Sequence, residues 1–331
     1  MSINGHNSSP VNINFSVPQG SINGPIYFTC YSSTLKTCVP PKIQLVGYAD
    51  DHTIYSGYRA GDTVDDDALS RISQTLTDTK DWMLQNRLKM NDEKTEFIVF
   101  GSRQSLAKCN VSEIVVGDCL VSRSSVVTLL GVEIDENLNF KQHITSKART
   151  AALSMFNLKK LRRHLDRRNC LKIANALIFS HMDYANSVFI NLPKVTMHPF
   201  QRIQNMTAKV ILGVSKFSST TEALKELHFL PVSVRCEYKL LVLVFKCLHN
   251  LAPNYLIDLI RVKDYSYKTK RSQSVLLKVP LSRNKCFADR SFSVAGPSCW
   301  EKLPSDIRSI ESLGIFKKKL KTFLFQRTFA C

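Results

Sequence analysis

Apolar and polar positions in the first 135 residues alternate between strand-like and helix-like spacing. Short apolar runs bounded by turn residues predict strands and hairpins over 2–15, 45–55 and 113–121. The sequences "EFIVF" (96–100) and "VTLLGVEID" (127–135) each predict one further strand. Between these runs, apolar residues at helical spacing predict a helix over 65–90. This alternation predicts an α+β unit.

The pattern changes to helical periodicity from His143 onward. Four stripes of apolar residues at helical spacing predict helices. The stripes run from Ile144 to Leu158, Leu171 to His181, Phe200 to Ile211, and Leu240 to Leu248. The last 71 residues, 261–331, are basic and Ser-rich, and they end in a predicted amphipathic helix over 312–325. We therefore expect three regions, with boundaries 1–135, 136–260 and 261–331.

Charge is distributed unevenly along the chain. The formal net charge is +18, yet residues 50–100 are net acidic, and residues 171–331 hold 25 Lys and Arg against 10 Asp and Glu. Such an excess indicates a polyanionic partner, either nucleic acid or an anionic membrane. No apolar run approaches the ~20 residues that span a bilayer, which favours nucleic acid and predicts no membrane association.

The N-terminus and the cysteines bear on the compartment. "MSINGHNSSP" lacks the basic and apolar regions of a signal peptide. The ten cysteines show no zinc-binding spacing, and Cys170, Cys236 and Cys247 stand in apolar contexts typical of reduced core residues. We expect an intracellular protein, cytoplasmic or nuclear and not secreted, with no metal bound to cysteine.

The stretch "LVGYADDHTIY" places Asp50 and Asp51 between two strand-like runs. Two explanations fit. Aspartate is a common turn residue because its side chain bonds nearby backbone amides. Alternatively, the carboxylates bind Mg²⁺, which prefers oxygen ligands, and paired ions ~3.5–4 Å apart can drive nucleotidyl transfer.

The order of neighbouring motifs favours the metal site. "SVPQGSINGP" precedes the aspartate pair, "LKMNDEKTEFIVF" follows it, and "VTLLGV" comes next. Together these blocks resemble the reverse transcriptase of jockey-like non-LTR retrotransposons. The resemblance extends into "GVEIDENLNFKQHI" and the C-terminal "FADRSFSVAGPSCWEKLPSDI". It implies a partial polymerase palm, an antiparallel sheet with helices, followed by a helical thumb-like region.

The resemblance also implies roles for individual residues. Asp50, with Asp51 as an accessory carboxylate, would bind Mg²⁺. Lys94 would protonate the pyrophosphate leaving group. The alternative explanation is that Lys94 is an ordinary solvated lysine at the end of a helix. The remaining implied roles are contacts with the incoming nucleotide and template at Gln19 and Gly20, and a primer grip at Leu130 and Gly131. The implied partners are an RNA template, a DNA primer, their hybrid and deoxynucleoside triphosphates; no oligomeric state is implied.

One departure from the family limits the expected activity. Family members carry a further aspartate on a strand upstream of the Pro-Gln-Gly loop, and residues 1–49 contain no acidic residue. A two-metal site without the carboxylate that positions both ions should lose most of its activity. We therefore expect a truncated reverse-transcriptase domain that is weak or inactive as an isolated chain, so that its status as an enzyme is open.

The segment Lys147–Arg168 is rich in Lys and Arg, and Asp166 is its only acid. A solvated face of a packed helix is the ordinary explanation, whereas phosphate contacts along a duplex would suit a thumb. Tyr184, Phe200 and Trp300 could stack on bases, but core packing is the favoured use.

Two further explanations stay open beside a polymerase fragment. One is a non-catalytic nucleic-acid-binding protein descended from such an element. The other is a fragment whose palm does not fold alone, because a missing strand would leave an exposed sheet edge.

Overall fold

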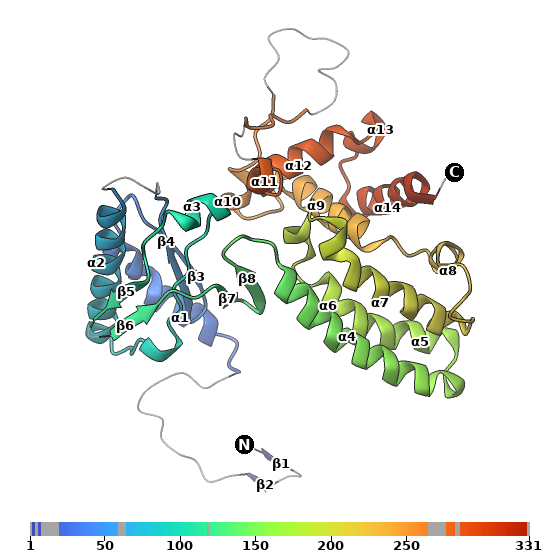
Figure 1. Cartoon of the computed structure of the whole chain (residues 1–331), viewed down its shortest axis with the longest axis horizontal. Coiled ribbons are helices and arrows are strands. Elements are labelled where there is room, and N and C mark those ends of the chain that lie inside the picture. The colour runs from blue at the N-terminus through green and yellow to red at the C-terminus, as the bar shows by residue number, and fades with distance from the viewer. Residues whose placement is uncertain are drawn as a thin grey trace. The chain divides into compact units, whose positions relative to one another are not determined.

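The computed structural model describes residues 2–3, 6–7, 20–58, 64–117, 119–263, 276–281 and 285–329. The chain packs as two units, Met1–Ser125 and Val126–Cys331, and each is considered by itself (Figure 1). Helices combine with antiparallel strand pairs, in agreement with the α+β class expected from the sequence. The three regions bounded at 135 and 260 stay a prediction.

The strands of the first unit form separate two-stranded antiparallel pairs in the described part of the chain. These pairs are β1 (Ser2–Ile3) with β2 (His6–Asn7), β3 (Gln44–Tyr48) with β4 (Asp51–Tyr55), and β5 (Glu113–Val116) with β6 (Cys119–Ser122). The hairpins expected near the N-terminus, at the aspartate pair and at Gly117 are therefore present. Residues 8–19 lie outside the described residues, and so does Asp118.

One long helix supports the first unit. α2 (Val64–Gln85) matches the helix predicted over 65–90 and packs against β5 and the 3₁₀ turn η1 (Ser33–Cys38). Leu35, Trp82 and Val116 are among the buried side chains of this unit. The shorter helical pieces are α1 (Gly24–Ser32), η2 (Asp92–Lys94) and α3 (Arg103–Ala107).

Two strand predictions from periodicity were wrong in detail. Residues 96–100 are not a strand, because Phe97 makes only an isolated bridge with Arg123, and a strand needs a continuous ladder. Residues 127–135 are not one strand but a hairpin of β7 (Val126–Leu129) and β8 (Val132–Asp135). Within this apolar run, Leu130 and Gly131 form a two-residue turn that the alternation of apolar residues did not indicate.

The second unit is predominantly helical. In Figure 1, α4, α5 and α7 run side by side, and α9 packs against α12 and α14. The helices are α4 (Lys141–Leu161), α5 (Arg167–Ala174), α6 (Ser180–Asp183), α7 (Lys194–Leu212), α8 (Thr220–Glu226), α9 (Val232–Leu248), α10 (Asn254–Ile257), α11 (Lys285–Ala288), α12 (Phe292–Glu301), α13 (Ser305–Arg308) and α14 (Leu313–Phe329). Short turns η3 (Arg162–His164) and η5 (Asn186–Phe189) connect some of them.

Apolar periodicity correctly located most of this core. The stripe of α4 from Ile144 to Leu158 is buried throughout its predicted positions. The second stripe was only partly right, because a π-helical turn, η4 (Asn175–Phe179), follows α5. Its wider turn changes the helical phase, so that Ile178 and Phe179 are buried whereas Leu177 is exposed.

Among the described residues, no helix combines the length and the apolar character needed to cross a membrane.

Candidate functional site

Asp50 and Asp51 lie where strands β3 and β4 of the first unit meet. Tyr48 pairs with Asp51 at the end of the ladder, so Ala49 and Asp50 form a two-residue turn and Asp51 begins β4. Both aspartates are exposed to solvent. The hairpin therefore presents two adjacent carboxylates at its tip.

The turn residue Ala49 has a φ of 54°, in the left-handed region that L-amino acids rarely adopt. Alanine tolerates this geometry better than a β-branched residue would, since its side chain is only a methyl group. Beside the turn, His52 pairs across the hairpin with Gly47, and a Cβ added at Gly47 would lie 3.3 Å from the His52 ring. The ring nitrogen Nδ1 of His52 is 3.1 Å from the carbonyl oxygen of Asp50. These contacts hold the backbone that carries the first carboxylate.

The carboxylates at the hairpin tip fit Mg²⁺ only in part. Two exposed carboxylates are oxygen ligands of the kind that Mg²⁺ takes, since it is commonly held by one or two carboxylates together with substrate phosphates. Within the described residues, no group of three or more His, Cys, Asp or Glu side chains converges as a metal site. The hairpin thus fits the part of a magnesium site that a nucleotide would complete, and it does not make a closed protein cage.

Lys94 lies on a separate surface turn of the first unit. It is the last residue of η2, where its backbone amide donates to the carbonyl of Asn91 at 3.1 Å, and its side chain is exposed. Its neighbour Asp92 is fixed by Lys80 of α2, whose Nζ is 3.0 Å from the carboxylate. This ion pair anchors the turn to α2 and leaves the Lys94 amine at the surface.

Of the two loop residues expected to contact nucleotide and template, Gln19 lies outside the described residues. Gly20 has a φ of +83°, and a Cβ placed there would meet nothing within 4 Å. The backbone conformation, rather than crowding, therefore favours glycine at this position.

The tip of the β7–β8 hairpin in the second unit carries the predicted primer-grip pair. Leu130 and Gly131 both have positive φ, 47° and 78°, as type I′ hairpin turns require. The hydroxyl of Tyr184 donates a hydrogen bond of 2.6 Å to the carbonyl oxygen of Leu130. Tyr184 is 53% exposed, so the expectation of core packing was wrong for it, whereas Phe200 and Trp300 are buried.

The base of the same hairpin is held by two side chains. The carboxylate of Asp135 accepts hydrogen bonds from the amides of Asn137, Asn139 and Phe140 at 2.5–3.1 Å, just before α4. The amide of Glu133 donates to Nδ1 of the buried His143 at 3.2 Å. Burial, aided by the positive charge of Lys147, lowers the pKa of His143 from 6.5, and its Nε2 finds no partner among the described residues.

Within the predicted set, only residues adjacent in sequence share a structural element. Asp50 and Asp51 share the β3–β4 hairpin, and Leu130 and Gly131 share the β7–β8 hairpin. Sequence reasoning missed the supporting roles of Asp135 and His143. The Asp preceding a predicted helix was an available signal for the first, since Asp commonly binds free amides at helix starts.

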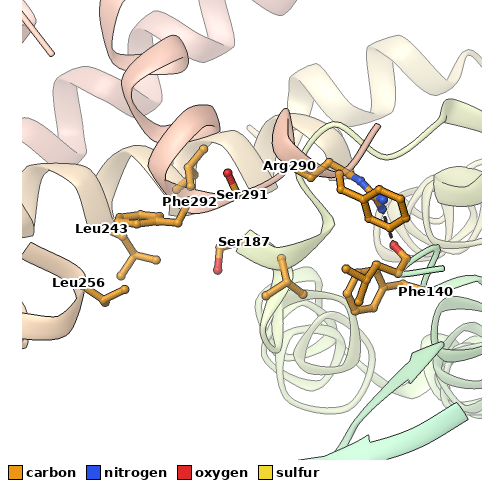
Figure 2. Close-up of a pocket in the computed structure, with 11 residues that line it drawn as sticks. Phe140, Ser187, Leu243, Leu256, Arg290, Ser291 and Phe292 are labelled. Atoms are coloured by element: carbon orange, nitrogen blue, oxygen red, sulfur yellow. Dashed lines mark hydrogen bonds between the residues drawn. The ribbon is translucent and has the colours of Figure 1, made fainter. Parts of the chain in front are cut away.

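The second unit also contains an apolar pocket of about 380 Å³ (Figure 2). Phe140, Leu243 and Phe292 contribute to its wall, and Arg290 donates a hydrogen bond to the carbonyl of Leu138 at its edge. No carboxylate is present among the described residues that line it. The lining of the pocket therefore offers no carboxylate of the kind that the aspartate pair provides.

Comparison with known proteins finds one matching family model. The family model "Reverse transcriptase (RNA-dependent DNA polymerase)" matches residues 1–134, which include both predicted carboxylates and both hairpin tips. Residues 1–134 of the chain are thus similar to the reverse transcriptase family.

The curated relatives are polymerases of mobile elements. The chain is 24% identical over 234 residues to the probable RNA-directed DNA polymerase from transposon X-element of Drosophila melanogaster. It is 22% identical over 236 residues to the RNA-directed DNA polymerase from mobile element jockey of the same species. These matches cover 68% and 69% of the chain and 25% of each relative, so the chain spans about a quarter of their length. No solved structure matches the chain significantly.

Proposed function

We propose that this chain carries part of the catalytic region of an RNA-directed DNA polymerase. One observation carries the proposal: an antiparallel hairpin with Asp50 in its two-residue turn and Asp51 at the first position of β4. The family reaction adds a deoxynucleotide to the 3′-hydroxyl of a primer on an RNA template and releases pyrophosphate.

Each predicted residue has a role in this proposal. Asp50, with Asp51 beside it, would hold Mg²⁺, which when bound offsets negative charge on the phosphates. Lys94, whose amine is exposed, donates a proton to the departing pyrophosphate. Gln19 and Gly20 contact the nucleotide and template, and the turn at Leu130 and Gly131 supports the primer end. The partial palm lies in residues 1–135, and the helices of 136–260 act as the thumb.

The isolated 331-residue chain is expected to be weak. Its carboxylates at the hairpin tip fit only part of a two-metal site, and residues 1–49 supply no further acid. Because the bridging ligand positions both ions at once, its lack costs most of the rate.

Metal-directed backbone cleavage tests the site without requiring activity. Fe²⁺ replaces Mg²⁺ at oxygen sites and generates hydroxyl radicals that cut nearby backbone. We expect cleavage near residues 48–53 in the presence of a deoxynucleoside triphosphate, lost in Asp50→Asn and retained in Asp258→Asn, an exposed aspartate of the second unit. Cleavage that is unchanged in Asp50→Asn would refute the metal role of the hairpin.

Primer extension tests the level of activity. On an RNA template with Mg²⁺, the chain should extend a DNA primer no faster than Asp50→Ala does. Template-dependent extension that Asp50→Ala abolishes would disprove the weak-activity proposal while supporting the catalytic role of Asp50.

A second candidate is a non-catalytic nucleic-acid-binding protein. The net charge of +15 in residues 171–331 favours it, and so do the exposed Lys159 and Lys160 at the end of α4 and Arg163 in η3. It predicts binding to hybrid or duplex nucleic acid whose log affinity falls with log salt by roughly 0.7–0.9 per phosphate contacted. Binding that is insensitive to salt would exclude this candidate. For either function we propose an intracellular location, testable by imaging a fluorescent fusion.

A further inference from the structure

One end of the helical unit combines clustered positive charge with an unusually exposed aromatic ring. We name it the Phe217 surface and define it by its exposed residues, which come from the end of α4, η3, the start of α5 and the α7–α8 loop: Lys159, Lys160, Arg163, His164, Arg168, Lys216 and Phe217.

The α7–α8 loop is tied to the end of α4 by arginine contacts. Nε of Arg162 donates to the carbonyl of Val210 at 3.1 Å, and its guanidinium lies 3.4 Å from where a Cβ would stand on Gly213. Gly213 has a φ of +72° and ends α7. Lys209, in the last turn of α7, donates from Nζ to the carbonyl of Lys216 in the loop at 2.8 Å. The turn at the end of α4 and the loop that carries Phe217 are thus held against each other.

The side chain of Phe217 has no packing role that explains its identity. It is 85% exposed, and its neighbour Lys216 places Nζ 4.8 Å from the centre of the ring. The loop is ordered by a turn, in which the amide of Ser218 donates to the carbonyl of Ser215 at 3.1 Å. An aromatic ring held in water on a defined turn is available to a ligand.

The charge around this ring remains largely uncompensated. Residues 159–168 contain six Lys and Arg and one acid, Asp166, which caps α5 through the amide of Asn169. Glu226 pairs with Arg167 at 2.7 Å. Within the described part of the chain, the Lys and Arg residues that define the surface make no ion pair with an acid, although Arg163 donates a hydrogen bond to His164 at 2.9 Å.

We propose that the Phe217 surface binds single-stranded nucleic acid, with phosphates on its Lys and Arg residues and a base stacked on Phe217. The proposal rests on the proposed function for its expectation of a nucleic-acid partner. Stacking on aromatic rings beside a basic track is the general way in which proteins bind single strands. A duplex offers no free base face along its length, so the ring distinguishes a single strand from a hybrid.

An anionic membrane is the competing partner for a basic surface with an exposed aromatic residue. Membrane binding by a surface generally buries a wide apolar face. Here Phe217 and Val214 are the exposed large hydrophobic residues of the loop, and the surrounding charge includes arginine, which matches phosphate geometry in two-point contacts. These features favour nucleic acid.

Fluorescence anisotropy with the full chain tests the proposal. The probes are a labelled oligo(U) of roughly 16 nucleotides, near the upper site size of a single-strand-binding module, and an RNA–DNA hybrid of the same length. Phe217→Ala should weaken oligo(U) binding about tenfold, in the range measured for loss of one base–aromatic stack, and leave hybrid binding within about twofold. Phe217→Trp should restore the affinity. Val195→Ala is the matched control, because Val195 is also 85% exposed in the same unit.

The remaining outcomes separate the alternatives. Arg163→Glu with Arg168→Glu should weaken oligo(U) binding and reduce its salt dependence, since phosphate contacts are lost. Unchanged oligo(U) affinity in Phe217→Ala, or equal loss on both probes, would overturn the proposal. Co-sedimentation with phosphatidylserine vesicles that depends on Phe217, without an effect on oligo(U), would assign the surface to membranes instead. Phe217→Ala should leave the Fe²⁺-directed cleavage near residues 48–53 unchanged, so that failure of the polymerase proposal is distinguishable from failure of this one.

Discussion

The hydroxyl of Tyr184, at the end of α6, donates a 2.6 Å hydrogen bond to the carbonyl of Leu130 at the tip of the β7–β8 hairpin. A side chain 54 residues further along the chain therefore contacts the turn of the hairpin. Because Leu130 has a positive φ, which an L-amino acid adopts at a cost, this external contact helps to hold the turn.

Removing that hydroxyl should loosen the hairpin without unfolding the unit. Tyr184→Phe is expected to cost about 0.5–1 kcal/mol, the ordinary net value of a neutral hydrogen bond. Amide exchange in 126–135 should accelerate, whereas α7 should keep its protection. Tyr255→Phe, another exposed tyrosine of the unit, is the control. Equal exchange in wild type and Tyr184→Phe would show that the bond does not hold the turn.

The left-handed conformation of Ala49 predicts which residues its position accepts. Ala49→Gly should be tolerated, because glycine adopts positive φ without a steric penalty. Ala49→Val should destabilise the β3–β4 hairpin by about 1 kcal/mol or more, since a β-branched residue is a genuine outlier there. Amide exchange over 44–55 measures both effects. Slower or unchanged exchange in Ala49→Val would contradict the strained turn.

Burial of His143 predicts a pH dependence for the second unit. Its pKa is lowered below the ordinary 6.5, so the unfolded chain binds a proton more readily than the folded chain. Stability contributed by neutral His143 is therefore present above about pH 6.5 and is lost as the pH falls toward the folded pKa. Urea unfolding of a Trp82→Phe chain, followed through Trp300, should show this loss. His143→Gln should show a smaller loss between pH 7 and 5.5, and an identical loss would refute this assignment.

The ion pair between Arg235 and Asp183 should contribute more than the exposed pair between Arg167 and Glu226. Arg235 contacts the carboxylate with two nitrogens, Nε at 2.8 Å and Nη2, and lies 5.5 Å from the ring of Phe179. Arg235→Met is expected to cost about 1–3 kcal/mol, as for hydrogen bonds to charged groups. Arg167→Met should cost less than about 1 kcal/mol, the usual limit for surface pairs. If Arg235→Met and Arg167→Met lower the free energy of unfolding in urea by similar amounts, the expected difference between the two ion pairs is refuted.

Cysteine reactivity should follow burial. Desolvation raises the pKa of Cys236 to about 12 and that of Cys299 to about 11, and both thiols are buried. Cys30 and Cys119 are exposed. Iodoacetamide near pH 8 should therefore alkylate Cys30 and Cys119 in the folded chain, and Cys236 and Cys299 only after denaturation, as peptide mass spectrometry would show. Early labelling of Cys236 would contradict its packing.

Several features were determined by the sequence alone. Local periodicity located α2, α4 and the β3–β4 hairpin, because each element is specified by the spacing of its own apolar residues. The order of short motifs around Asp50 was sufficient to indicate the family resemblance, and the family model matches residues 1–134.

Other features were decided only by tertiary structure. The turn inside 127–135 depends on Tyr184, 54 residues away, and the phase of the helix around Leu177 depends on a π-turn that periodicity does not reveal. Nothing in the sequence distinguishes Phe217 from a buried apolar residue. Its exposure follows from how the end of α7 and Arg162 hold its loop. Local spacing specifies the elements, but contacts between distant segments decide which side chains face solvent and a ligand.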